Sequence, residues 1–165
     1  MGKKGAEIVK KGGAGLNDLI KKLNKAYADE WLAYIQYWTG AQIIEGKMRP
    51  DIQKELLEHA GEEFAHAQML ADRIIQLGGT PLLEPKDWLK ESGCGYAVPR
   101  DFDSRAILEQ NIEGERCAIE TYNDLLNYVK LSKDPVTFHI IRKILAEEVE
   151  HEQDLEDLHT DVNTK

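Results

Sequence analysis

Two Glu-x-x-His motifs are the strongest chemical signal in this sequence. They are Glu63-Phe-Ala-His66 and Glu148-Val-Glu-His151. In an α-helix, positions i and i+3 lie on one face, so each motif offers a carboxylate and an imidazole to the same point in space. Oxygen and nitrogen ligands in combination suit iron or manganese better than calcium, and better than zinc held by thiolates. The motifs therefore predict metal binding, provided that they face each other in the fold.

A repeat within the sequence connects the two motifs to two further glutamates and a pair of tyrosines. Each residue of a first set has a counterpart 85 positions later. The first set is Glu30, Ala33, Tyr37, Glu63 and His66, and the second is Glu115, Ala118, Tyr122, Glu148 and His151. The two glutamates of each set are 33 residues apart, so two helical hairpins with the same register would hold these groups at the same height. A lone Glu-x-x-His motif is common on acidic helix surfaces, such as those that Glu62 and Glu147 suggest here, but the whole combination is hard to obtain by chance.

Four long segments have the periodicity and composition of helices that could position these residues. They cover residues 16–45, 51–78, 103–131 and 134–159, and they are rich in Leu, Ala, Glu, Lys and Ile. The links after the first and third segments are short, which predicts two antiparallel hairpins. Residues 79–102 contain three prolines and are long enough to cross the whole bundle, with a short helix near 86–91. We therefore predict an all-α fold, a four-helix bundle with one long crossover between its second and third helices.

The candidate ligands interrupt the apolar stripes of these segments. Apolar residues recur at spacings of three and four along every segment, and one glutamate stands near the middle of each stripe. An unpaired buried carboxylate is costly, and four of them would repel one another. Two Fe²⁺ ions carry the charge that balances four glutamates, so we predict two iron ions per subunit, for which manganese or zinc can substitute. Their ligands are Glu30, Glu63, His66, Glu115, Glu148 and His151.

The bulk composition restricts the class of protein. The chain has 165 residues, which suits one domain with a single core. No apolar run approaches the ~20 residues that span a bilayer, and the N-terminus lacks the continuous apolar core of a secretory signal. We expect a cytoplasmic protein that does not bind membranes. The formal net charge of −9 disfavours general attraction to nucleic acid and suits a protein that gathers cations.

The six candidate ligands resemble the ferroxidase centre of bacterioferritin, and the chain resembles the ferritin-like superfamily over essentially its whole length. This resemblance implies that Glu63 and Glu148 bridge two irons, that the other two glutamates are terminal ligands, and that each histidine completes one iron. Tyr37 matches a bacterioferritin tyrosine implicated in electron transfer, but a core tyrosine bonded to a ligand carboxylate is an equally good interpretation. Phe64 stands where bacterioferritin has its haem-ligating methionine, so we predict no haem.

The length, the crossover and the two cysteines resemble the Dps-like proteins called thioferritins. Cys117 follows Glu115 by two residues, which turns it about 200° away from the ligand face. The resemblance implies that Cys94 and Cys117 form a disulfide or dithiol close to the site, where the pair could relay electrons or sense peroxide. The alternative is two unrelated thiols. Only 14 residues follow His151, which leaves little room for the fifth helix of large ferritin cages and suggests a homo-oligomeric cage of twelve subunits.

Short segments flank the predicted bundle, which we place at residues 16–160. We expect a flexible arm rich in lysine and glycine over residues 1–15 and a tail over residues 161–165. The lysines of the arm resemble the DNA-binding tails of some Dps proteins. Because the body of the protein is acidic, a solvated arm is the favoured interpretation and DNA is a less favoured partner.

The resemblance implies an iron-oxidising protein that stores iron in a cage and protects against peroxide by consuming Fe²⁺ with H₂O₂ or O₂. Tyr37, Cys94 and Cys117 are the candidate catalytic residues beside the metal ligands. One alternative is a peroxidase similar to rubrerythrin, but the usual rubredoxin domain with paired Cys-x-x-Cys motifs does not occur in this sequence. Another is a nucleoid-binding structural protein of the Dps type in which iron is secondary.

Overall fold

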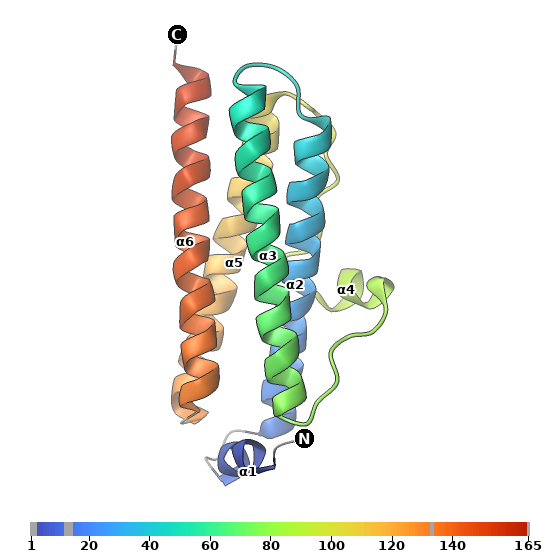
Figure 1. Ribbon diagram of the computed structural model, residues 1–165, viewed down its shortest axis with the longest axis vertical. Coiled ribbons are helices and arrows are strands. Elements are labelled where there is room, and N and C mark those ends of the chain that lie inside the picture. Colours follow the sequence, from blue (N-terminus) through green and yellow to red (C-terminus); the bar gives the residue numbers. More distant parts are fainter. Residues whose placement is uncertain (1–2, 12–14, 133, 165) are drawn as a thin grey trace.

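The computed structural model describes residues 3–11, 15–132 and 134–164, and six helices are the regular elements of these residues (Figure 1). The four long ones are α2 (Leu16–Ile43), α3 (Arg49–Gln76), α5 (Ser104–Ser132) and α6 (Pro135–Asn163). The two short ones are α1 (Lys4–Lys11) and α4 (Pro85–Glu91). Helices α2 and α3 form one antiparallel hairpin and α5 and α6 form the other, so the predicted four-helix bundle is confirmed. None of the described helices is both long and apolar enough to traverse a bilayer.

Residues at the helix ends join the two hairpins. Asp134 caps α6, because its carboxylate accepts hydrogen bonds from the backbone N–H groups of Val136 and Thr137, both at 3.2 Å. The same carboxylate receives Nη2 of Arg73 from α3 at 2.8 and 3.0 Å. This buried pair fixes the end of one hairpin against the start of the last helix. At the other end of α3, Pro50 occupies the first turn, as expected for a helix start.

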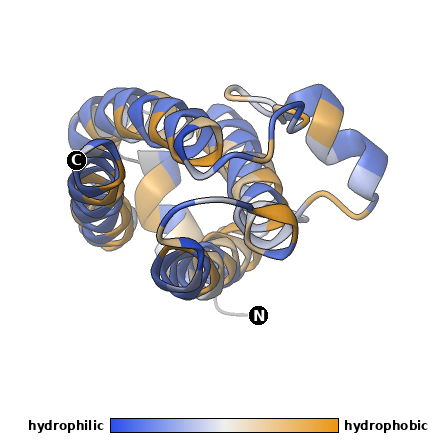
Figure 2. Ribbon diagram, turned by 90° about the horizontal axis from the view of Figure 1, so that it is seen from above, coloured by the Kyte–Doolittle hydropathy of each residue, from blue (hydrophilic) through white to orange (hydrophobic). Residues whose placement is uncertain are grey.

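The apolar core is divided into two clusters by a layer of buried polar side chains. Viewed along the bundle, the apolar residues of the long helices face the interior (Figure 2). One cluster contains Leu23, Leu70 and Ile144 and lies toward the start of α2. The other contains Leu56 and Leu108 and lies toward the end of α2. The polar layer between them is the place where the sequence puts the candidate ligands.

The crossover between α3 and α5 runs along α2 and is fastened to it (Figure 1). The carboxylate of Asp29 accepts hydrogen bonds from the backbone N–H groups of Gly93 and Cys94 at 2.7 and 2.9 Å. Trp88 of α4 stacks on Trp31 of α2 with ring centroids 4.8 Å apart. These contacts place Cys94 over the middle of the bundle, beside the polar layer.

Helices occupy much of both segments outside the predicted bundle, and the flexibility predicted for the arm and tail stays a prediction. Helix α1 occupies the arm, and Val9 is buried against the cluster that contains Leu23. Helix α6 continues to Asn163, with Val162 buried in the other cluster and its carbonyl accepting Lys47 Nζ at 3.0 Å. Each segment therefore contributes one buried valine to an end of the bundle. Residues 1–2, 12–14 and 165 of these segments lie outside the described residues.

Candidate metal centre

The six predicted ligands meet in the polar layer, and each is at most 3% exposed. They form two groups of four, in each of which the ligand atoms lie within 4.8 Å of one another. One group is Glu30, Glu63, His66 and Glu148, and the other is Glu63, Glu115, Glu148 and His151. Glu63 and Glu148 belong to both groups. The arrangement therefore suits two metal ions that share two carboxylates.

Each histidine points one ring nitrogen into its group. Nδ1 of His66 lies 3.1 Å from Oε1 of Glu148, 3.3 Å from Oε2 of Glu30 and 3.5 Å from Oε2 of Glu63. Nδ1 of His151 lies 3.2 Å from Oε1 of Glu63 and 3.4 Å from Oε2 of Glu148. The equal register of the two hairpins thus gives two equivalent half-sites.

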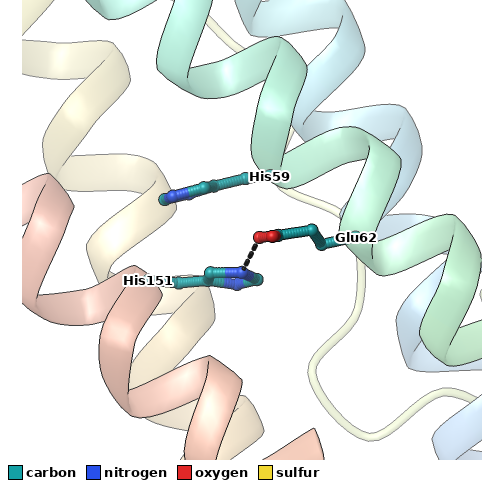
Figure 3. A group of neighbouring side chains, drawn as sticks. All are labelled: His59, Glu62 and His151. Atoms are coloured by element: carbon teal, nitrogen blue, oxygen red, sulfur yellow. Dashed lines mark hydrogen bonds and ion pairs between the residues drawn. The ribbon is translucent and has the colours of Figure 1, made fainter.

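Two acids beside the Glu-x-x-His motifs orient these histidines. Nε2 of His66 lies 3.0 Å from Oε2 of Glu147, and Nε2 of His151 lies 2.7 Å from Oε2 of Glu62. An acceptor at Nε2 favours the tautomer that leaves Nδ1 free to bind a metal ion. The sequence suggests only ordinary surface acids at Glu62 and Glu147, so their contacts with the histidines, such as that of Glu62 with His151 (Figure 3), are a finding of the structure. The signal was present in the sequence, because these two residues are also 85 positions apart.

Two tyrosines contact Glu30 and Glu115, the glutamates that each belong to a single group. The hydroxyl of Tyr37 donates to Oε1 of Glu115, and the hydroxyl of Tyr122 donates to Oε1 of Glu30. Both tyrosines are buried. Tyr37 was a predicted site residue, whereas Tyr122, its counterpart in the repeat, was missed. Each half-site therefore contains a carboxylate that is positioned by a tyrosine from the opposite hairpin.

Several buried atoms of the candidate ligands have no hydrogen-bond partner in the described part of the chain, as expected for atoms that bind metal ions. Among the described residues, seven buried atoms of the six ligands have no hydrogen-bond partner. They are Oε2 of Glu30, Oε1 of Glu63, Nδ1 of His66, Oε2 of Glu115, both carboxylate oxygens of Glu148 and Nδ1 of His151. Buried polar atoms normally have hydrogen-bond partners, and a site that binds an ion is one of the accepted exceptions. Carboxylate oxygens with imidazole nitrogens form a donor set suited to iron.

The chain itself can hold protons where metal ions would bind. Burial, followed by repulsion from other site carboxylates, raises the pKa values of Glu30 and Glu115 well above the ordinary value. Burial opposes a charge on the two histidines, but attraction to Glu148 and the other site carboxylates, whose oxygens lie close to Nδ1, outweighs it. This attraction raises the pKa of His66 well above its ordinary value and that of His151 to about 12. A metal ion that binds here has to displace these protons.

The two cysteines form a disulfide next to the site, with Cα atoms 5.8 Å apart. This observation decides between the paired and unrelated thiols that the sequence left open. Cys94 and Cys117 line a pocket of about 160 Å³ that opens between α2 and α5 and reaches Glu30 and Glu115. The disulfide thus forms part of the wall of a pocket that the candidate ligands also line. Its role in electron transfer stays a prediction.

Phe64, the residue on which the prediction of no haem rests, lies outside the ligand groups. It is exposed on α3, and its ring packs edge-on against Trp31 with centroids 5.6 Å apart. The absence of haem stays a prediction.

Comparisons with known proteins agree with this geometry. The family model described as "Ferritin-like domain" matches residues 20–164. The DNA protection during starvation protein of Pyrococcus furiosus is 32% identical over 155 residues, covering 93% of this chain and 83% of that protein. A bacterioferritin of Desulfovibrio desulfuricans is 30% identical over 133 residues, covering 81% of this chain and 69% of that protein. Among solved structures, the dodecameric thioferritin of Bacteroides fragilis, a bacterioferritin-related protein, is 49% identical with a TM-score of 0.94 and covers 98% of this chain and 95% of that chain. The chain therefore belongs to the ferritin-like family.

Proposed function

We propose that the protein oxidises Fe²⁺ at a dinuclear site inside each subunit. The observation that carries this proposal is the convergence, from four helices, of buried ligand atoms, seven of which lack a hydrogen bond to a described residue. Iron is the substrate here, and each Fe²⁺ gives up one electron. Two Fe²⁺ ions together supply the two electrons that convert H₂O₂ and two protons into two water molecules. They can equally convert O₂ and two protons into H₂O₂.

The surroundings of the ligands suit this reaction. Glu62 and Glu147 keep the histidine nitrogens aimed into the site, and Tyr37 and Tyr122 hold the terminal carboxylates in place. The pocket between α2 and α5 is of a size to admit a small oxidant or a cation. Because Fe²⁺ ions react in pairs, the oxidant receives two electrons at once, which avoids the single-electron reduction of peroxide to a hydroxyl radical.

Storage in a cage is the second part of the proposal. The B. fragilis thioferritin is dodecameric, and this chain covers nearly all of it at high structural similarity. Trp38 of α2 and Leu57 and Phe64 of α3 are large apolar side chains that the isolated subunit exposes. Subunit contacts would bury them, since exposed apolar clusters usually mark interaction surfaces. We propose a cage of twelve subunits that collects the oxidised iron as a mineral.

An anaerobic titration with Fe²⁺, followed by H₂O₂ or O₂, tests the proposed oxidation. The wild-type assembly should bind and oxidise two iron ions per subunit. The double variant Glu63→Ala/Glu148→Ala removes both shared carboxylates and should lose paired oxidation. A control, Glu58→Ala/Glu150→Ala, removes two exposed acids from the same helices and should behave as wild type.

Two outcomes would refute the proposal. Oxidation that persists in the Glu63→Ala/Glu148→Ala variant would exclude this site, and a wild-type protein that leaves Fe²⁺ unoxidised would exclude the activity. Native mass spectrometry tests the cage separately, with a mass of twelve subunits expected. Oxidation without a retained mineral core would favour the alternative of a peroxidase similar to rubrerythrin.

A further inference from the structure

The disulfide lies in the wall of the pocket between α2 and α5, where a dissolved reductant can meet it. Cys94 lies on the crossover and Cys117 on α5, and both side chains are half-buried. They line the pocket together with Asp29 of α2. Reduction of the disulfide would therefore leave two thiols and a carboxylate around one pocket.

Reduction would also leave the two sulfur atoms close together, because other contacts hold the crossover. Oδ1 of Asp29 accepts the backbone N–H of Cys94 at 2.9 Å. Further along, the backbone N–H of Ala97 donates to Oε1 of Gln36 at 3.0 Å, and the Ala97 carbonyl accepts Nε2 of Gln110 at 2.6 Å. The crossover is thus bonded to both α2 and α5 without the disulfide, so Cys94 keeps its place beside α5.

Asp29 is a candidate ligand in this pocket. Its side chain is 8% exposed, and Oδ2 is buried with no hydrogen-bond partner among the residues that the structure describes. Buried polar atoms normally have such a partner. Because Oδ1 already accepts the crossover backbone, Oδ2 is the oxygen that remains for an ion. The pocket therefore combines one unsatisfied oxygen with two sulfur atoms that become metal ligands on reduction.

The internal repeat shows that the fold does not require this set of residues. A shift of 85 positions converts Asp29 into Gly114, and the reverse shift converts Cys117 into Leu32. Cys94 belongs to the long crossover, which joins the two hairpins once. The equivalent place in the repeat thus lacks both the carboxylate and the thiols, so their combination is particular to the α2–α5 face.

A tetrahedral metal ion fits between two thiolates at this position. The Cα atoms of Cys94 and Cys117 are 5.8 Å apart, so both side chains can reach one ion. Two thiolates bound to zinc at about 2.3 Å lie about 3.8 Å apart, against about 2 Å in a disulfide, so each sulfur has to move by roughly 1 Å. Thiolates select thiophilic ions, whereas the carboxylates and imidazoles of the dinuclear site suit iron.

We propose that Cys94 and Cys117, once reduced, bind one thiophilic metal ion per subunit together with Asp29. Reduction adds two electrons and two protons to the disulfide and yields two thiols. A divalent ion then replaces the two thiol protons, and a water molecule completes the tetrahedron. The redox state of the pair thus determines whether the pocket holds an ion. The proposal does not depend on iron oxidation, because the six ligands of the dinuclear site take no part in it.

Cd²⁺ is a suitable probe, because cadmium bound to thiolates gives an ultraviolet charge-transfer band that carboxylate and imidazole ligands do not give. The assembled protein is reduced without oxygen by a trialkylphosphine, which becomes a phosphine oxide with an oxygen atom from water. After removal of the phosphine, titration with Cd²⁺ should produce the band. Unreduced protein and Cys94→Ser/Cys117→Ser should not produce it. Circular dichroism verifies that the reduced bundle stays helical.

The variant Asp29→Asn tests the third ligand. Its amide oxygen can still accept the crossover N–H groups, but the carboxylate is gone, so the Cd²⁺ affinity of the reduced protein should fall by roughly 10- to 100-fold. The control Asp124→Asn makes the same change at an exposed position of α5 outside the pocket and should bind Cd²⁺ like the wild type. Unchanged affinity in Asp29→Asn would overturn the site, and so would a reduced wild type without the band.

The variant Glu63→Ala/Glu148→Ala separates this proposal from the proposed function. After reduction it should still develop the band and saturate it with one Cd²⁺ per subunit, and X-ray anomalous scattering should place the ion between Cys94 and Cys117. Loss of the band in this variant would overturn the proposal. A wild type that leaves Fe²⁺ unoxidised but develops the band would support this site and contradict the proposed function alone.

Discussion

Loading of the metal-free protein with Zn²⁺ should release about four protons per subunit at pH 6.0. In the metal-free site, the raised pKa values of His66 and His151 keep two imidazoles protonated, and those of Glu30 and Glu115 keep two carboxyl groups neutral. Two divalent ions bring four positive charges. Exchange of four protons for these ions leaves the charge of the buried site unchanged. This exchange has the lowest electrostatic free energy in a region shielded from water.

The size of the pH dependence of zinc binding follows from the linkage between proton release and metal binding. When four protons leave as two ions bind, the overall binding constant for the pair changes about 10,000-fold per pH unit, or about 5 kcal/mol. The sign is fixed by the raised pKa values: protons compete with metal, so binding strengthens as pH rises and weakens as pH falls. Zn²⁺ is suitable because it reports binding without oxidation.

The assay is a zinc titration in weak buffer with a pH indicator. At pH 6.0 a water molecule bound to zinc, with a pKa of about 7 in catalytic sites, largely keeps its protons and adds little to the count. Glu63→Ala/Glu148→Ala should lose the stoichiometric release, whereas Glu58→Ala/Glu150→Ala should retain it. Release of fewer than two protons per subunit from the wild type would refute the assignment of protons to the site.

Three further predictions concern the surroundings of the site. Tyr37→Phe and Tyr122→Phe should each slow iron oxidation, measured by stopped-flow absorbance, by a similar factor of roughly 10 to 100. The reason is that each change removes one hydrogen bond that positions a ligand carboxylate. An effect confined to Tyr37→Phe would point instead to a role in electron transfer. The double change Cys94→Ser/Cys117→Ser opens a cross-link over 23 residues and should lower the free energy of unfolding by about 3 kcal/mol in denaturant titrations; an unchanged midpoint would contradict this. Val9→Ala should cost about 1.6 kcal/mol by the same measurement if α1 is held by burial of that side chain, and no loss would mean that α1 adds no stability.

The bundle and the metal ligands could be predicted because the information is periodic and repeated. Apolar spacing gave four helices, and short links fixed two hairpins. A constant shift of 85 positions then required the groups of the two hairpins to share one height. No individual motif would have sufficed, since Glu63-x-x-His66 alone could lie on a surface. Register within the chain made the ligand set predictable without knowledge of any contact.

Contacts across the hairpins were harder to predict. Glu62 is half exposed and Glu147 about one-third exposed, so both look like solvated acids. Their partners are His151 and His66 on the opposite hairpin, far away in the sequence. Val9 was missed for a similar reason, because its burial depends on the shape of a bundle end. In each case a polar or isolated apolar residue acquires its role only from the packing of helices.

The two halves of the centre are alike, but the two faces of the bundle that flank it are not. At the α2–α5 face, Asp29 and Cys117 build the crossover anchor and the disulfide, and their counterparts in the repeat are Gly114 and Leu32. At the α3–α6 face, His59 replaces an isoleucine of the apolar core. A symmetric ligand set does not favour entry or exit of cations on either side. Any preferred route for cations into or out of the site must therefore come from these unlike faces. Replacement of His59 by isoleucine should therefore alter how cations reach or leave the site while the ligands and their half-site symmetry remain intact.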